Sequence, residues 1–300
     1  MSENELLALT SANQNALYSS LDNFIIEKRI GRGSFSVIYK ARSRHDVNCV
    51  VALKEVQILE MVDSSARLDC MKEINLLQKL DHPNIIRYIS SLIENNKLYI
   101  FLELADSGDL SRMIRNFRKI RKLIPERTIW KYFVQICDGL EHMHSKSIMH
   151  RDLKPANVLV TTGGVIKLGD LNLSRFFSPK TNAAQSIVGT PYYMSPERIH
   201  EKPYTFSSDI WSLGCLLYEL AALHSPFFEE RQNIYMLCRR IDKCLYAPIP
   251  SEIYSQEIGD LVSKCITANP SERPDIVAVH KVAKQMNSLF LENKYSKRAK

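Results

Sequence analysis

The sequence predicts a two-lobed α+β fold, with a β-rich N-terminal lobe followed by a mainly helical C-terminal lobe. Patterns typical of strands recur through the first 103 residues. Beyond Gly108 the dominant period becomes helical, so we expect the junction between Glu103 and Asp109. Three hundred residues with 45% hydrophobic content can bury a core large enough for both lobes.

The same patterns divide the chain into segments. We expect a flexible N-terminal extension, rich in Ser, Asn and Ala, at residues 1–20 and a basic tail at residues 289–300. The folded domain between them covers residues 21–288. It divides into an N-lobe at 21–103, a hinge at 103–109 and a C-lobe at 110–288.

Composition and charge exclude several classes of protein. The richest apolar stretch, residues 210–223, is too short to span a membrane and contains Glu219, so we expect no membrane insertion. Glu3 and Glu5 stand where a secretory signal needs positive charge. Seven cysteines without a C-x-x-C pair suit free thiols in a reducing compartment, the cytoplasm or the nucleus. The net charge of +7 lies partly in residues 294–300, and a solvated tail explains it without a specific nucleic-acid partner.

Three strands are predicted at the start of the N-lobe, at residues 24–30, 37–41 and 50–56. The run Gly31-Arg32-Gly33-Ser34-Phe35-Ser36 places two glycines at the tip of the first hairpin. Such a tip could fold over a phosphate chain, because glycines expose backbone N–H groups without side-chain obstruction. A plain hairpin turn explains the two glycines equally well.

Lys54 ends an apolar run in the third strand, where an unpaired ammonium group would be costly. The helix predicted at residues 67–80 carries Glu73 beside three leucines, and a carboxylate in that place needs a cation. We therefore predict that Lys54 pairs with Glu73. The alternatives are a lysine on the solvent face of its strand and a glutamate on the helix surface.

The run His150-Arg151-Asp152-Leu153-Lys154-Pro155-Ala156-Asn157 concentrates polar chemistry directly before an apolar strand. It places a carboxylate, an amine and a carboxamide within six residues. Taken alone, such a run could also be a charged surface loop. Its interpretation depends on what the next strands bring close to it.

Residues 158–160 and 165–168 flank a Thr-Thr-Gly-Gly turn and predict a β-hairpin. Folding this hairpin sets Asn157 beside Leu168 and brings Asp170 within a residue or two of Asn157. Two oxygen ligands brought together in this way suit a hard cation such as Mg²⁺. Asp152 lies just upstream, within reach of a substrate hydroxyl group. By itself, Asp170 would more often be a turn former.

From about residue 24 to 285 the chain resembles a eukaryotic protein kinase, because further landmarks of that family follow in order. These are Ser195-Pro196-Glu197 for the A-P-E element, Asp209-Ile210-Trp211-Ser212-Leu213-Gly214 at the start of a buried helix, and Arg273 in Pro270-Ser271-Glu272-Arg273-Pro274. Leu153-Lys154-Pro155 and Gly189-Thr190-Pro191 are similar to the serine/threonine branch. The resemblance implies structural roles for Arg151, Thr190, Glu197, Asp209 and Arg273, with Arg273 paired to Glu197.

Three stretches, residues 102–111, 124–127 and 195–200, resemble the NIMA-related kinases. The nearest likeness is to the short members, which consist of little more than a catalytic domain with an N-terminal extension. This resemblance implies roles around microtubules and mitosis and activation by a larger NIMA-related kinase. It also implies a location in the cytoplasm, at microtubules or centrosomes, or in the nucleus.

The kinase resemblance implies ATP and Mg²⁺ as cofactors and protein serine or threonine hydroxyls as substrates. It implies that Lys54 holds the α- and β-phosphates, oriented by Glu73, and that Asn157 and Asp170 hold the metal. Asp152 accepts the hydroxyl proton and Lys154 lies near the transferred phosphoryl group. The expected ATP-binding residues are Ile30, Gly31, Arg32, Gly33, Ser34, Phe35, Ser36, Val37, Ile38, Ala52, Lys54, Leu102, Glu103, Ala105 and Leu159. Among them, the backbone of Glu103 and Ala105 binds adenine between Ala52 and Leu159, and Leu102 is the gatekeeper.

Regulation by phosphorylation is also implied. Arg151 adjoins Asp152, an arrangement that in kinases accompanies activation by loop phosphorylation, since the phosphate pairs with arginine and orders the loop. Ser186, four residues before Thr190, is the candidate phosphosite. The alternative is a Ser-rich loop without a switch.

The chain departs from the kinase pattern in two places. The third glycine of the phosphate loop and the valine two residues later are replaced by Ser36 and Ile38. The D-F-G element reads Asp170-Leu171-Asn172, and asparagine is among the few residues that tolerate positive φ. A pseudokinase-like scaffold that acts by binding partners therefore stays open, although the intact polar set argues against it. A third alternative, a basic interaction module, rests only on the tail.

Overall fold

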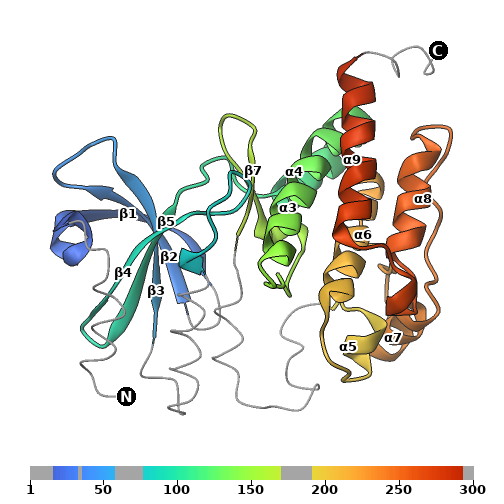
Figure 1. Ribbon diagram of the computed structural model, residues 1–300, viewed down its shortest axis with the longest axis horizontal. Coiled ribbons are helices and arrows are strands. Elements are labelled where there is room, and N and C mark those ends of the chain that lie inside the picture. Colours follow the sequence, from blue (N-terminus) through green and yellow to red (C-terminus); the bar gives the residue numbers. More distant parts are fainter. Residues whose placement is uncertain (1–15, 33–35, 58–76, 170–190, 293–300) are drawn as a thin grey trace. The chain divides into compact units, whose positions relative to one another are not determined.

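The computed structural model describes residues 16–32, 36–57, 77–169 and 191–292. These residues form two compact units, one up to residue 106 and the other from residue 107 on. The first unit is a β-sheet with short 3₁₀ turns, and the second is built mainly of helices (Figure 1). The predicted α+β fold is therefore confirmed.

The first unit is one five-stranded antiparallel sheet with the strand order β1-β2-β3-β5-β4. Its elements are η1 (Ala16–Ser19), η2 (Leu21–Asn23), β1 (Phe24–Arg32), β2 (Ser36–Ser43), β3 (Val50–Val56), β4 (Tyr88–Glu94) and β5 (Lys97–Glu103). The first three strands contain the three strands that the sequence predicts. The helix predicted at residues 67–80 lies mostly outside the described residues, of which Leu77 and Gln78 are helical.

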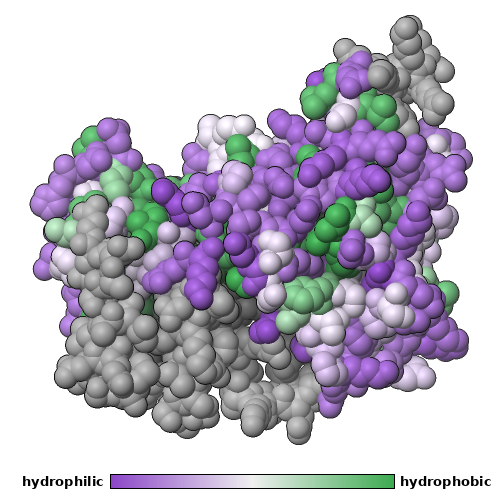
Figure 2. All heavy atoms as spheres, viewed as in Figure 1, coloured by the Kyte–Doolittle hydropathy of each residue, from purple (hydrophilic) through white to green (hydrophobic). Residues whose placement is uncertain are grey.

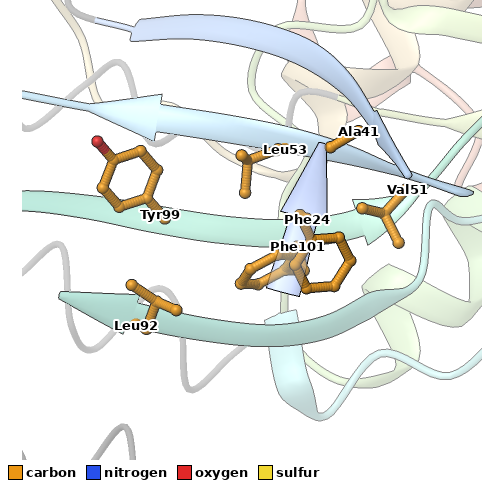
Figure 3. Close-up of a cluster of buried hydrophobic side chains, with 7 residues drawn as sticks. All are labelled: Phe24, Ala41, Val51, Leu53, Leu92, Tyr99 and Phe101. Atoms are coloured by element: carbon orange, nitrogen blue, oxygen red, sulfur yellow. The ribbon is translucent and has the colours of Figure 1, made fainter. Parts of the chain in front are cut away.

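A cluster of apolar side chains from all five strands forms the core of the sheet unit (Figure 3). Its fully buried members are Phe24, Ala41, Val51, Leu53, Leu92, Tyr99 and Phe101. Tyr18 of η1 packs against two of these rings, with centroids 5.6 Å from Phe24 and 5.2 Å from Phe101. The described end of the predicted extension, residues 16–20, is therefore ordered by aromatic packing and belongs to this unit.

The second unit surrounds one buried helix. Its elements are α3 (Leu110–Lys119), α4 (Glu126–Ser145), η4 (Pro155–Asn157), β6 (Val158–Val160), β7 (Ile166–Leu168), α5 (Pro196–Ile199), α6 (Phe206–Ala222), α7 (Ile234–Asp242), α8 (Gln256–Cys265), η6 (Pro270–Glu272) and α9 (Ile276–Leu291). The long helix predicted at residues 127–144 is α4. Helix α9 packs along α4, and α8 packs along α6.

Helix α6 is buried on nearly all sides, with 13 of its 17 residues inaccessible to solvent. A helix that is apolar all round belongs in a core, because it has no face that prefers water. Gly214 lets α8 approach closely: a Cβ atom at this position would lie 2.6 Å from Cβ of Cys265 and 3.0 Å from Cγ1 of Ile266. Glycine is therefore a packing requirement at position 214.

No helix in the described part of the chain is long and apolar enough to cross a membrane. The six cysteines among the described residues are free thiols. Cys137, Cys215 and Cys265 are buried, and Cys49, Cys238 and Cys244 are half-buried.

We predict that Gly214→Ala destabilises the domain by about 1–3 kcal/mol, because the added methyl group overpacks the contact between α6 and α8. Gly259→Ala is the matched control: Gly259 lies in α8, and a Cβ atom there meets nothing within 4 Å. That change should stabilise the domain by about 0.5–1 kcal/mol through helix propensity. Urea unfolding measures both, and equal effects of the two variants would contradict the packing argument.

Candidate active site

The polar run at residues 150–157 is followed by the predicted hairpin of β6 and β7. The pairing of the two strands is shifted by one residue from the predicted register. In the structure Val158 lies opposite Leu168, and Gly169 N donates to Asn157 O at 2.9 Å. The prediction that Asn157 lies beside Leu168 is therefore wrong. Asn157 pairs with Gly169, the residue directly before Asp170.

The turn explains the shift of register. Gly164 N donates to Thr161 O at 2.8 Å, and Gly164 has φ +73°. Thr161 N in turn donates to Val165 O at 3.0 Å, which closes the strands around a three-residue loop. A turn followed by a left-handed residue is a common three-residue hairpin loop, and it adds one residue compared with a two-residue loop. The composition Thr-Thr-Gly-Gly does not say which of its glycines takes the left-handed conformation.

Asp152 is at the centre of a small polar cluster. Lys154 Nζ lies 2.7 Å from Asp152 Oδ2. Asn157 Nδ2 donates to the same Oδ2 at 2.9 Å and to the backbone oxygen of Asp152 at 2.7 Å. The side chain of Asp152 is 40% exposed, so the carboxylate is both held in place and open to solvent. The structure therefore brings together three of the residues that the sequence singled out.

The backbone of this loop is fixed from α6. Asp209 Oδ2 accepts from His150 N and Asp209 Oδ1 from Arg151 N, both at 2.9 Å. Arg151 has φ +69°, a left-handed conformation that costs a non-glycine residue free energy. The two hydrogen bonds to one buried carboxylate stabilise this conformation, which turns the chain immediately before Asp152.

Asp209 is fully buried and stays charged. His144 Nε2 donates to its Oδ2 at 2.8 Å and Tyr204 OH to its Oδ1 at 2.5 Å. Burial alone would raise the pKa of Asp209, but the hydrogen bond from His144 and the nearby His150 hold that pKa below its ordinary value. The sequence identified Asp209 as structural, yet it did not reveal His144 and Tyr204 as its partners. His144 lies 65 residues from Asp209 in the chain, so no local sequence pattern signals that contact.

One described residue, Asn157, could contribute an oxygen ligand to a hard metal ion. Asn157 is buried and its amide nitrogen is committed to Asp152, so the carboxamide oxygen is the atom that could ligate Mg²⁺. Within the described residues there is no group of three or more His, Cys, Asp or Glu side chains that could hold a metal. The second predicted ligand, Asp170, lies outside those residues, so the metal site stays a prediction.

Lys54 lies in the sheet unit, in β3 between Ile38 of β2 and Ile100 of β5. It is only 6% exposed, so the alternative of a lysine on the solvent face of the strand is wrong. A buried ammonium group requires polar partners, because its desolvation is otherwise costly. Its predicted partner Glu73 lies outside the described residues.

The other predicted nucleotide residues of the sheet unit occupy adjacent strands. Gly31 lies opposite Ile38, and Arg32 opposite Val37. Ala52, in β3, lies opposite the predicted gatekeeper Leu102 of β5. The remaining members on these strands are Ile30 at the exposed end of β1 and Ser36 at the start of β2.

The predicted adenine contacts follow at the end of β5. Glu103 N donates to the backbone oxygen of Arg87, the residue before β4, at 2.9 Å. This N–H group is therefore already hydrogen-bonded within the sheet unit. Ala105, just beyond the strand, is half-buried. Leu159 lies in β6 of the second unit. Its predicted packing on the far side of adenine from Ala52 stays a prediction.

Several predicted residues lie outside the described part of the chain. They are Gly33, Ser34, Phe35, Glu73, Asp170, Asn172, Ser186 and Thr190.

Glu197 and Arg273 form a buried, bidentate ion pair in the second unit. Arg273 Nη1 and Nη2 donate to Glu197 Oε1 and Oε2 at 2.8 and 2.9 Å. Ser208 Oγ adds a third hydrogen bond to Glu197 at 2.6 Å, and the guanidinium group lies 5.0 Å from the Trp211 ring. Arg273 also donates to the backbone oxygen of Thr267 at 2.8 Å. The contact that the kinase resemblance implies is therefore present, and it joins α5, α6 and the segment before α9.

Hydrogen bonding decides the charge state of Glu197. Burial alone would raise the pKa of this carboxyl group. The bonds from Arg273 and Ser208 outweigh burial and lower the pKa from 4.5 to about 2.

The sheet unit, the helical unit and the anchored loop around Asp152 together define a protein kinase domain. Residues 24–285 match the protein kinase domain family. Serine/threonine-protein kinase Nek5 of Homo sapiens is 38% identical over 275 residues, which cover 91% of this chain and 37% of that protein. The probable serine/threonine-protein kinase nek2 of Dictyostelium discoideum is 38% identical over 261 residues, which cover 85% of this chain and 61% of that protein.

The chain therefore belongs to the protein kinase family and, within it, to the NIMA-related serine/threonine kinases. A third relative, serine/threonine-protein kinase Nek8 of Danio rerio, is 40% identical over 250 residues, or 83% of this chain and 35% of its own length. The chain spans less than two thirds of the length of each of these three relatives. The kinase and NIMA-related resemblances read from the sequence are confirmed.

We predict that the stabilisation by Glu197 is lost in acid. An unfolded glutamate takes up a proton near pH 4.5, whereas folded Glu197 stays ionised until about pH 2. The lowered pKa therefore stabilises the fold above pH 4.5 by about 3 kcal/mol, and this contribution falls as the pH drops toward 2.

Urea unfolding of the wild type and Glu197→Gln, compared between about pH 5 and about pH 3, measures this effect. The difference in unfolding free energy should shrink as the pH falls. A difference that stays constant over this range would show that Glu197 is not the titrating group.

Proposed function

We propose that the chain transfers the γ-phosphoryl group of Mg-ATP to serine or threonine hydroxyl groups of protein substrates. The observation that carries this proposal is the carboxylate of Asp152, fixed by Lys154 and Asn157 and left 40% exposed. A side chain that is positioned and accessible can accept a proton from an incoming hydroxyl group. The membership in the NIMA-related kinases supports the same reaction.

The residues of this chain supply position and charge for the reaction. Lys154, 2.7 Å from Asp152, places a positive charge beside the attacking oxygen and the transferred group. Asn157 orients Asp152 with its amide nitrogen and, with Asp170, would hold the metal ion through oxygen. The buried Lys54 would bind the α- and β-phosphates. When bound, Mg²⁺ neutralises charge on the phosphates.

We expect Asp152→Asn to lower phosphorylation of a generic protein substrate by about 10²–10⁴-fold, since the amide cannot accept the proton. Asp170→Ala should abolish most activity through loss of the metal ligand. Asp260→Asn, which changes an exposed carboxylate on α8, is the matched control and should retain full activity.

The assay follows phosphate incorporation from Mg-ATP into protein. Wild-type activity in both Asp152→Asn and Asp170→Ala would disprove the catalytic function. A pseudokinase-like scaffold acting by partner binding would then be the better description.

Phosphorylation of Ser186 is proposed to activate the enzyme. The support is the position of Ser186 four residues before Thr190, together with Arg151 beside Asp152, a cation that could pair with a phosphate. Pairing of the phosphate with Arg151 would order the segment around Ser186.

We expect Ser186→Ala to lower activity by at least about tenfold, because the variant cannot form the phosphate–arginine pair. Ser178→Ala, in the same segment, is the control. The assay compares both variants after identical treatment with Mg-ATP, and full activity of Ser186→Ala would refute the switch.

The cellular setting is proposed from the family likeness alone. Larger NIMA-related kinases are the proposed activators, and mitotic or microtubule processes the proposed setting. The corresponding locations are the cytoplasm, the microtubule or centrosome surface, and the nucleus. The cofactors and partners proposed are ATP, Mg²⁺ and protein substrates.

A further inference from the structure

Positive charge is concentrated in one short segment of the helical unit. Residues 110–125 form α3 and the loop that leads to α4, and they contain six basic residues and no acidic one. The whole chain carries a net charge of +7, so this segment supplies +6 and all other residues together supply +1. The basic residues are Arg112, Arg115, Arg118, Lys119, Arg121 and Lys122, and we call them the basic surface.

All six side chains of the basic surface are exposed, whereas Leu110, Ile114 and Ile124 anchor the segment in the core. Hydrophilic side chains cover this face over α3, as Figure 2 shows in purple. Among the described residues, no carboxylate forms an ion pair with any of the six. Only Arg118 is held by a distant backbone group, the carbonyl oxygen of Leu223. Arg115 donates to Ser111 Oγ at 2.5 Å within α3. All six cations are exposed, and in the described part of the chain none has a carboxylate partner that a docked acidic segment would have to displace.

Arg121 occupies a position that favours glycine. Lys122 N donates to Phe117 O and Arg121 N donates to Arg118 O, both at 3.1 Å, which is the hydrogen-bond pattern of a Schellman motif. The residue after the cap of this motif is left-handed, and Arg121 has φ +53°. A non-glycine residue in that conformation is strained, so the chain holds a cation here at a cost in stability. Arg231 shares this conformation outside the basic surface, so the inference rests on charge and exposure and not on the backbone angle.

Apolar side chains lie among the cations. Ile120 is 61% exposed and Leu123 is 40% exposed, and they flank Arg121 and Lys122 in the sequence. Cations around exposed aliphatic groups match a protein interface, in which apolar contacts form the centre and charges form the rim. We infer that the basic surface is a docking site for an acidic segment of a separate protein, one in which carboxylates alternate with aliphatic residues.

The sequence at the two ends of this chain does not offer such a segment. Residues 1–20 contain two carboxylates, Glu3 and Glu5. Residues 293–300 contain four basic residues and no acidic one. Charge complementarity therefore does not favour either of these two segments as the occupant.

Nucleic acid and membrane fit the basic surface less well. Single-stranded nucleic acid is bound by stacking on exposed aromatic rings, but the one aromatic residue in 110–125, Phe117, is half-buried. A membrane-surface helix needs an exposed apolar face, whereas the apolar face of α3 is turned into the unit through Leu110 and Ile114. These alternatives become outcomes of the experiment.

The test measures binding of the full 300-residue chain to a fluorescent synthetic peptide in which glutamates alternate with leucines. Replacing three cations, by Arg115→Glu, Arg121→Glu and Lys122→Glu together, should weaken binding by at least about tenfold. Binding to the wild type should also weaken about tenfold between ~50 mM and ~300 mM salt, because exposed charges are screened. Binding is independent of catalysis, so its failure leaves the proposed kinase function untouched.

Arg121→Gly separates docking from folding. It should raise the unfolding temperature by about 2 °C, since glycine relieves the strain, and weaken peptide binding about threefold. Arg231→Gly is the matched control, because Arg231 is also exposed and left-handed, with φ +62°, but precedes α7 outside the basic surface. It should give a similar thermal gain with unchanged binding.

Equal peptide binding by the two glycine variants would overturn the inference. Tighter binding to single-stranded DNA, or to phosphatidylserine vesicles, than to the peptide at the same salt concentration would also overturn it, in favour of that other ligand.

Discussion

The buried carboxylate of Asp209 connects the core of the helical unit to the chemistry at its surface. Four donors, from His144, His150, Arg151 and Tyr204, converge on its two oxygens. They keep it ionised inside a protein interior, and two of them are backbone groups of the loop that carries Asp152, the proposed catalytic base. The backbone directly before Asp152 is therefore fixed by α6, the most buried helix of the described residues.

A second carboxylate, that of Glu197, is also held ionised by several donors next to α6, namely Arg273 and Ser208. Ser208, in the first turn of that helix, donates to Glu197, while Arg273 lies over Trp211 of the same helix. One helix thus supports both the catalytic loop and the segment that ends at the A-P-E element. The basic surface differs from these two buried carboxylates, because its six cations are exposed, four of them on α3 and two in the loop that follows. It is proposed as a site of contact with another molecule.

Local patterns predicted much of this molecule. Strand periodicity located β1, β2 and β3, helical periodicity located α4, and the motif at residues 150–157 located the polar cluster. The hairpin after Asn157 was predicted in kind but not in register, because the left-handed Gly164 adds one residue to the loop. The packing of the Tyr18 ring on Phe24 and Phe101 has no local signal in the sequence, because the residues around Tyr18 are mostly small and polar. The six cations of the basic surface can be counted in the sequence, but their common exposure is a property of the fold.

The sequence by itself determined the α+β class and the kinase family and supplied the candidates for the reactive side chains, because these depend on residue types at fixed local spacing. Only the tertiary structure decided that Lys54 is buried, that Asn157 pairs with Gly169, and that Asp209 is tied to His144 and Tyr204. Such facts depend on contacts between residues far apart in the chain and on the backbone angle of single residues. Long-range contacts and single backbone angles produce no periodic pattern in the sequence, because packing and hydrogen bonding between the elements determine both.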